Sequence, residues 1–154
     1  MGNTANTIMI KKADCTEEHY TFLQIFFDLH VTLQEFTTRK DLFVVTAETK
    51  NSELIGCMLV RQATLSSGKI VYRVQYTAVP TLHRGKGVNN KMLGYLYEYA
   101  KENNGANLVA SIRNDNVSSI ISFLRNGFRI YAAYGRVDYY KTGGMKVRVK
   151  RKIV

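Results

Sequence analysis

One run of residues constrains the fold of this chain more than any other, because it joins a strand to a helix through two glycines. The run covers residues 79–93 and reads VPTLHRGKGVNNKML. Gly85 and Gly87 let the backbone approach a ligand closely, and the helical turn that follows directs unpaired N–H groups and partial positive charge at the same point. We therefore expect an anion site here, with a diphosphate as its natural occupant. A tight turn without a ligand is the alternative.

Length and hydropathy favour one domain over residues 1–154. The chain has 154 residues, 45% of them hydrophobic, which is enough for one core of ordinary size. No run approaches the roughly 20 apolar residues that cross a bilayer, and residues 1–6 contain no apolar signal core. We expect a soluble cytoplasmic protein without a membrane partner.

The two cysteines, Cys15 and Cys57, are far apart in the sequence, and neither has a nearby histidine or cysteine to complete a metal site. Cys57 lies in the apolar run of residues 54–60, which favours packing in a core over reactivity. We predict two reduced thiols and no bound metal.

Charge is distributed unevenly along the chain, whose formal net charge is +10. Residues 13–38 contain five of the 12 acidic residues and no lysine or arginine, so the remainder carries 22 basic residues and a net charge of +15. Such an excess favours a polyanionic partner, either a phosphorylated cofactor or nucleic acid. The acidic segment favours a cationic one.

Hydrophobic periodicity and turn residues predict the order of the elements. Helices are expected over 17–36, where Asp14 and Glu17 have capping-box spacing, from Val88 to a stop at 103–105, and from Val117 to a stop at Gly127. Strands are expected over 7–11, 42–49, 53–65, 71–79, 106–112, 128–134 and 145–154, the last two forming a hairpin around 142–144. The order predicts a mixed α/β fold with one mostly antiparallel central sheet and helices on both faces.

Two motifs carry a resemblance to a known family. Arg84, Gly87 and Asn89 stand at the first, fourth and sixth positions of the pattern Q/R-x-x-G-x-G/A, from which Asn89 departs. The run of residues 116–128, NVSSIISFLRNGF, begins with an asparagine after a strand and continues through a helix with an aromatic residue to Gly-Phe. Together they resemble the two cofactor elements of the Gcn5-related N-acetyltransferase (GNAT) superfamily. The predicted order of elements is also the order of that superfamily.

The resemblance implies an N-acetyltransferase with acetyl-CoA as its cosubstrate. Main-chain N–H groups of residues 84–89 would hold the diphosphate, cations would add charge, and the end of the strand before the loop would pair with the pantetheine arm. The implied cofactor-binding residues are Thr77, Ala78, Val79, Arg84, Gly85, Lys86, Gly87, Val88, Asn89, Asn116, Phe123 and Arg125. Asn116 has a helix cap as its alternative role.

The expected catalytic residues depart from the pattern of well-studied relatives. Gln75 stands where the family often has a glutamate base, and Phe123 stands where it often has a tyrosine acid. Gln75 could orient a water, and a tyrosine could donate a proton. The tyrosine candidates are Tyr76, Tyr131, Tyr134, Tyr139 and Tyr140, of which Tyr76 and Tyr134 are the primary ones. The three histidines form no triad.

The acceptor is expected to be a small cationic amine, with a polyamine as the best single hypothesis. Thr21, Gln24, Asp28 and Glu35 would lie near one face of the first helical region if it is not broken near His30. The carboxylates of Asp28 and Glu35 would attract the amine, unless they only form a solvated helix face. A protein or peptide acceptor is the alternative.

A non-catalytic coenzyme A-binding or nucleic-acid-binding module is the hypothesis of another class. Residues 146–152 support it, although their alternation of basic residues with valine describes the wet face of an edge strand more simply. Nucleic acid is therefore disfavoured as the partner. A homodimer is not excluded.

Overall fold

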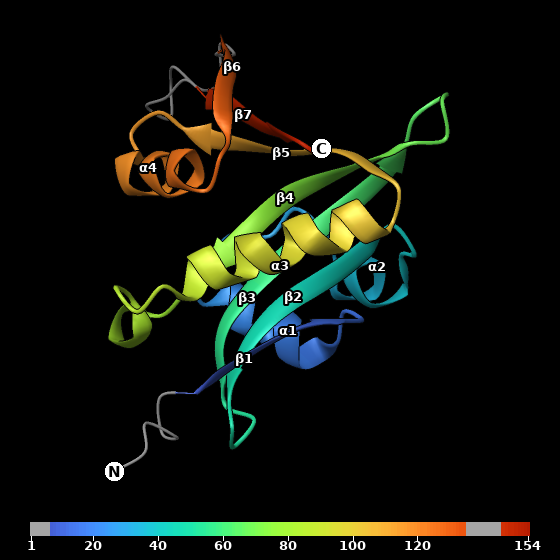
Figure 1. The fold of residues 1–154 in the computed structure, drawn as a ribbon. Helices are drawn as coiled ribbons and strands as arrows, with labels where there is room; N and C mark the ends of the chain where they lie inside the picture. Colours follow the sequence, from blue (N-terminus) through green and yellow to red (C-terminus); the bar gives the residue numbers. More distant parts are fainter. Residues whose placement is uncertain (1–6, 135–145) are drawn as a thin grey trace.

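The computed structural model describes residues 7–134 and 146–154, which form one sheet with helices against it (Figure 1). The strands are β1 Ile8–Ala13, β2 Leu42–Thr49, β3 Leu54–Thr64, β4 Ile70–Ala78, β5 Gly105–Arg113, β6 Arg129–Tyr134 and β7 Lys146–Lys152. The helices are α1 Glu17–Gln24, α2 Leu33–Thr38, α3 Val88–Glu102 and α4 Val117–Arg125, and a 3-10 turn, η2, covers Thr81–His83.

The sheet has seven strands in the order β1-β2-β3-β4-β5-β7-β6. Every neighbouring pair is antiparallel except β4 and β5, which run parallel because α3 crosses over between them. The predicted mixed α/β fold with a mostly antiparallel sheet is therefore confirmed. The turn predicted around residues 142–144 lies outside the described residues, although β6 and β7 pair as a hairpin would.

Two hydrophobic cores cover the two faces of the sheet. Phe43 and Val45 of β2 point to the core beneath α3, whereas Val44 points to the core beneath α1 and α2. Since successive strand residues face opposite sides, a strand covered on both sides must be apolar throughout. The first six residues of β2 are accordingly all buried. Figure 1 shows α3 and α4 in front of the sheet and α1 and α2 behind it.

Both cysteines pack in the core beneath α1 and α2, as free thiols. Burial raises the pKa of Cys15 to about 12 and also raises that of Cys57. Their thiols therefore stay protonated, and the core packing predicted for Cys57 is confirmed. Among the described helices, none is both long and apolar enough to cross a bilayer.

The helical region predicted over 17–36 is interrupted, because two short helices stand there with a loop between them, and the possible break near His30 is found over residues 25–32. Four of the loop's five apolar side chains, Phe26, Phe27, Leu29 and Val31, pack toward the core beneath α1 and α2, whereas Ile25 is exposed. Their spacing would spread them around a helix, so only a non-helical chain can turn all of them inward. Thr21, Gln24, Asp28 and Glu35 consequently share no helix face.

Hydrogen bonds to tyrosines hold this loop, and a second capping box ends it. The Tyr20 hydroxyl donates to the Val31 carbonyl at 2.8 Å, and the His30 N–H donates to the Tyr76 hydroxyl at 3.3 Å. Thr32 and Glu35 then cap each other's backbone N–H groups, which starts α2.

The prediction that residues 146–152 form an edge strand is also wrong. β7 lies inside the sheet between β5 and β6, and Val149 is fully buried. β6 is the edge. Sequence order suggested otherwise because β6 precedes β7 in the chain but is placed outside it.

β4 and β5 stay paired along only part of their length. Their register runs from Ile70 opposite Gly105 to Val74 opposite Ala110 and then stops. At the same point β4 carries a bulge against β3, because Leu59 pairs with Tyr76 and Val60 with Val74. Gln75 thus has no register partner in either neighbouring strand, and the strands part beyond it.

α3 approaches the sheet closely at Gly56 of β3. A Cβ atom there would lie 2.9 Å from Val88 Cγ1 and 3.1 Å from Met92 Cε. The missing side chain therefore lets the first turn of α3 lie directly on the sheet, which sets the height of the loop before it.

The cap of α1 makes the fold sensitive to acid. The predicted cap at Asp14 is replaced by Thr16, whose N–H donates to His19 Nδ1 at 3.1 Å. Burial lowers the pKa of His19 below its ordinary value of 6.5. As pH falls through 6.5 toward that lower value, the unfolded chain binds more protons than the folded one, so stability decreases.

We expect His19→Gln to weaken this pH dependence, because glutamine can fill the same place in the capping box without titrating. The measurement is the midpoint of thermal unfolding at about pH 7.5 and about pH 5.5. The drop between the two should be smaller in the variant than in the wild type. An equal drop would show that another group carries the effect.

Candidate active site

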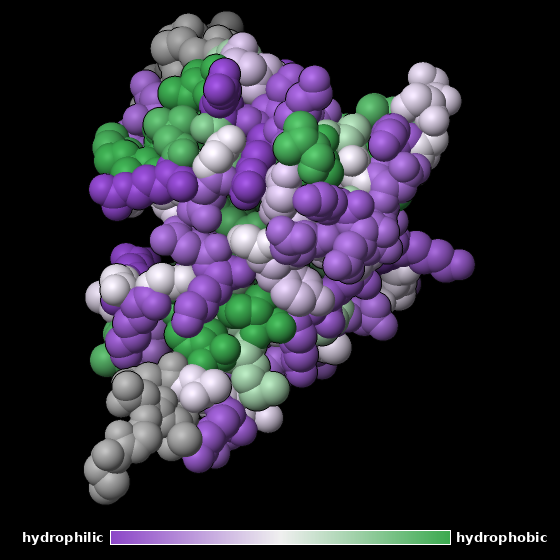
Figure 2. All heavy atoms as spheres, viewed as in Figure 1, coloured by the Kyte–Doolittle hydropathy of each residue, from purple (hydrophilic) through white to green (hydrophobic). Residues whose placement is uncertain are grey.

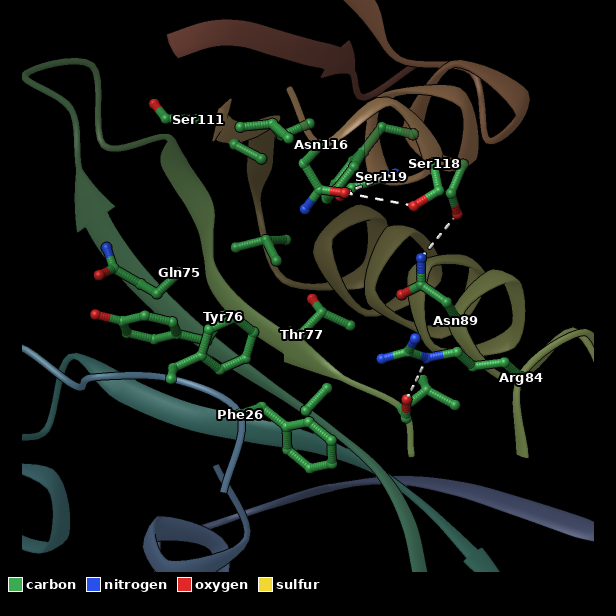
Figure 3. A pocket seen from close by; sticks show the side chains of 18 of the residues that line it. Phe26, Gln75, Tyr76, Thr77, Arg84, Asn89, Ser111, Asn116, Ser118 and Ser119 are labelled. Carbon is green, nitrogen blue, oxygen red and sulfur yellow. Dashed lines mark hydrogen bonds between the residues drawn. The ribbon is translucent and has the colours of Figure 1, made fainter. Parts of the chain in front are cut away.

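A cavity of about 580 Å³ opens where β4 and β5 part. Its walls come from the ends of these strands, from α4, from the loop before α3 and from the loop between α1 and α2. Gln75 and Tyr76 lie at one end and Arg84 and Asn89 at the other (Figure 3). Figure 2 shows the molecule hollowed between α4 and the loop before α3, with apolar side chains gathered over α4.

The glycine loop has the geometry of an anion site. Gly85 and Gly87 have φ values of 77° and 75°, and Gly87 is the N-cap of α3. Glycine has no side chain to cap the helix, so the N–H groups of the first turn remain available to a ligand. Substitution at either glycine would strain the backbone, because L residues rarely adopt this conformation.

The other residues expected to serve the diphosphate differ in where they lie relative to the cavity. Arg84 lines the cavity, and its Nε donates to the Val79 carbonyl at 2.9 Å. Lys86 and Arg125 are exposed cations that do not line it. Val88 points away from the cavity into the core, where it is 2% exposed, so only its backbone could serve a ligand.

Asn89, the departure from the family pattern, joins two helices. Its Nδ2 donates to Ser122 Oγ of α4 at 2.8 Å. One residue further along α3, Asn90 Oδ1 accepts a hydrogen bond from Asn126 Nδ2 at 2.9 Å. These bonds fix the distance from α4 to the first turn of α3. Glycine or alanine at position 89 could not make the first of them.

Asn116 caps α4, as its alternative role predicted. Its Oδ1 accepts a hydrogen bond from the Ser119 N–H at 3.3 Å and lies 3.4 Å from Ser118 Oγ. All three side chains also line the cavity. The cap and the cavity wall are therefore the same residues.

Two buried polar atoms of the cavity lining, Thr77 Oγ1 and Asn89 Oδ1, have no hydrogen-bond partner among the residues that the structure describes. A buried polar group left unpaired costs about 1–3 kcal/mol, so such atoms usually have a partner in the functional state. Thr77 stands on β4 beyond the last pair with β5, where strand edges also lack partners. Amide groups of a pantetheine arm could pair with these unpaired side-chain atoms and with the unpaired backbone edge of β4. Phosphates could bind the N–H groups of the glycine loop, so the residues present suit coenzyme A.

Among the described residues considered as proton carriers, only some line the cavity. Gln75 and Tyr76 both line the cavity, and the ring of Tyr76 stacks on Phe27 with centroids 5.0 Å apart. Phe123 lines it too, packed edge-on against Phe128. Tyr131 lies elsewhere, on β6. The side chain of Tyr134 and all of Tyr139 and Tyr140 lie outside what is described.

The carboxylates expected at the acceptor end do not line the cavity. Glu35 is exposed, and its Oε1 accepts a hydrogen bond from the Thr32 N–H at 3.1 Å, which lowers its pKa. Asp28 is exposed on the loop between α1 and α2. No aspartate or glutamate is among the described residues of the lining.

An aromatic wall takes the place of carboxylates. Phe26, Phe27 and Tyr76 line the cavity beside Gln75. Sequence reasoning missed the two phenylalanines because it placed them inside a helix. Their non-helical spacing was the signal that could have revealed them. Among the described residues, no cluster of histidine, cysteine or carboxylate side chains could hold a metal.

Comparison with known proteins identifies one family. The family model described as "Acetyltransferase (GNAT) domain" matches residues 5–129, which is most of the chain. No curated protein sequence matches.

Many solved structures share the fold. NAA60 of Arabidopsis thaliana in complex with acetyl-CoA has 14% identity and a TM-score of 0.75, over 96% of this chain and 99% of that chain. An IAA acetyltransferase from Bacillus cereus ATCC 14579 has 20% identity and a TM-score of 0.72, over 95% and 99%. A nourseothricin acetyltransferase has 21% identity and a TM-score of 0.62, over 75% and 67%. At these identities the likeness shows the fold alone.

The bond between Asn89 and Ser122 can be measured by a double-mutant cycle. We expect Asn89→Ala and Ser122→Ala to be coupled by about 0.5–1.5 kcal/mol in the free energy of unfolding, the net worth of one hydrogen bond. Urea unfolding of the two single variants and the double variant gives the coupling. Asn89→Ala with Ser118→Ala is the control pair, because no hydrogen bond joins them. If the changes in unfolding free energy were additive in both pairs, the hydrogen bond between Asn89 and Ser122 would not contribute to stability.

Proposed function

The chain belongs to the acetyltransferase (GNAT) domain family and is an N-acetyltransferase that uses acetyl-CoA, and we propose that its acceptor is a primary amine carried on an apolar or aromatic body. The observation that carries the proposal is the aromatic wall of Phe26, Phe27 and Tyr76, with no carboxylate among the described residues of the lining. An apolar amine gains from contact with these rings, and its ammonium form loses solvation there.

We assign the cofactor to the end of the cavity that holds the glycine loop. When bound, acetyl-CoA supplies an acetyl thioester that an amine can attack. N–H groups of the loop and the Arg84 guanidinium would hold the phosphates. Thr77 and Asn116, with the unpaired edge of β4 at 77–79, would hold the pantetheine arm.

The amine must reach the thioester without its proton. An alkylamine with a pKa of about 10.4 requires roughly 4.6 kcal/mol to be deprotonated at pH 7. Burial against the aromatic wall disfavours the ammonium and so lowers the pKa of the bound amine, which reduces this cost. We assign Gln75 to orient a water that passes the proton on to bulk solvent, since its position at the bulge leaves its backbone without a register partner on either side.

We assign Tyr76 two roles: its hydroxyl donates a proton to the leaving thiolate, and its ring contacts the acceptor amine. Its hydroxyl accepts a hydrogen bond from the His30 N–H at 3.3 Å, which fixes the ring and leaves its own proton free to donate. Phe123 has no proton to give. A thiol with a pKa near 8.5 is a fair leaving group, so a single weak donor suffices.

A small cationic amine such as a polyamine is the second candidate. Asp28 is exposed on the loop that presents Phe26 and Phe27 to the cavity, so its carboxylate could bind a distal ammonium at the entrance. Aromatic faces also attract cations, by about 0.5–2 kcal/mol.

Amine specificity tests the proposal. We expect kcat/KM for phenethylamine to exceed that for putrescine by roughly tenfold or more, the usual worth of a matched apolar contact. Phe27→Ala should remove most of this preference, whereas Phe27→Leu should keep part of it and Asp28→Asn should leave it unchanged. Release of free thiol from acetyl-CoA is the measurement. A preference for putrescine that Asp28→Asn abolishes would establish the second candidate instead, and turnover with peptides alone would overturn both.

Removing the Tyr76 hydroxyl should impair turnover and leave the cofactor site intact. We expect Tyr76→Phe to lower kcat by about 10²-fold, the lower end of general acid catalysis, with an unchanged KM for acetyl-CoA. Tyr95→Phe is the matched control, because its hydroxyl accepts from the Lys12 N–H outside the cavity. Thermal unfolding of both variants separates loss of structure from loss of chemistry. A folded Tyr76→Phe with full kcat would exclude the assignment.

A further inference from the structure

A second hollow, of about 630 Å³, lies on the part of the molecule formed by β6, β7 and the neighbouring turn of α3. It shares no lining residue with the acetyl-transfer cavity. Its lining contains four basic side chains, two tyrosines and two apolar residues, around one glycine. These are Arg129, Lys150, Arg151, Lys152, Tyr97, Tyr131, Ile130, Val154 and Gly127.

The four cations have no acidic partners within the described chain. Among the described residues, no aspartate or glutamate lines the hollow, and none of the four forms an ion pair with a described carboxylate. Arg129 and Lys150 stand directly opposite each other on β6 and β7. Like charges at such a cross-strand position destabilise the sheet, and a bound anion would relieve the repulsion.

Arg151 is held in a fixed position before any ligand arrives. Its guanidinium carbon lies 3.6 Å from the centre of the Tyr97 ring. Gly127 makes room for it, because a Cβ atom there would lie 3.0 Å from Arg151 Nε. An arginine stacked on a ring keeps its in-plane N–H donors free, which suits bidentate contact with a phosphate.

Tyr131 supplies an exposed aromatic surface beside the cations. Its side chain is 45% exposed at a bulge of β6, and Lys150 Nζ lies 5.0 Å from the ring centre. An acidic peptide would need the cations alone. A ring face next to cations is what the base and phosphate of a nucleotide need together.

We propose that this hollow binds nucleotide phosphate together with its base, either in a single strand of nucleic acid or in a free nucleotide. The phosphates lie against Lys150 and Lys152, which share one face of β7, Arg151 adds charge from the other face, and a base stacks on Tyr131. The volume is in the range of small-ligand sites, roughly 300–1,000 Å³. The basic residues of β7, which do not take part in the acetyl-transfer site, would then bind nucleotide phosphate. The site is independent of the acceptor amine.

Binding of a fluorescent twelve-nucleotide oligothymidylate, followed by anisotropy without coenzyme A, tests the proposal. The variants below change residues that line the second hollow and not the first cavity, so their effects report the second. We expect the double variant K150Q/K152Q to weaken binding roughly tenfold and to lower the salt slope by about 1.4, the value for two phosphate contacts on a single strand. The double variant K69Q/K101Q removes the same charge from exposed positions elsewhere and should change binding less than twofold.

Tyr131→Ala separates a base from a bare anion. We expect it to weaken oligothymidylate binding about tenfold without changing the salt slope, since stacking is worth about 1–3 kcal/mol per base. Competition by ATP would assign the site to free nucleotides, and failure of ATP to compete would assign it to strands. Equal losses in the two lysine variants would overturn the proposal. So would tight binding of polyglutamate together with an unaffected Tyr131→Ala.

Discussion

The parting of β4 from β5 is the constraint on which the rest of this structure depends. Pairing ends at Val74 and Ala110, and the bulge at Gln75 turns the remaining strand away. A sheet interior normally satisfies every backbone group, so two strands that separate inside it leave N–H and C=O groups that need another partner. The cavity, its unpaired Thr77 hydroxyl and the adjoining glycine loop all follow from this one break in the ladder.

Rigid elements hold the break open. α3 lies close on β3 at Gly56, and Asn89 and Asn90 tie its first turn to α4. The loop from α1 to α2 closes the other end through the Tyr76 hydroxyl. The site is thus held by three contacts between elements that are distant in sequence. Gly85 and Gly87 supply only the local geometry of the loop.

Much of the fold could be predicted from the sequence, because strand alternation and glycine turns are local signals. β2 covers the predicted residues 42–49, and α3 begins after Gly87 as the loop predicts. Long-range placement escaped prediction. The interior position of β7 depends on which edge β5 offers, and the loop at 25–32 depends on which side chains the sheet can bury. The aromatic wall was missed because it is part of the loop at 25–32. The glycine loop before α3 was recognisable because its function depends on its backbone, which the glycines mark in the sequence.

The insertion of β7 between β5 and β6 has a consequence for how the protein is made. β6 leaves the ribosome first but cannot join the sheet until β7 has arrived, so β5 exposes an open edge for the intervening time. An open apolar edge invites pairing with other chains. β7 closes that edge when it pairs with β5 from Asn107 to Arg113, so the strand that is made last also removes the exposed edge.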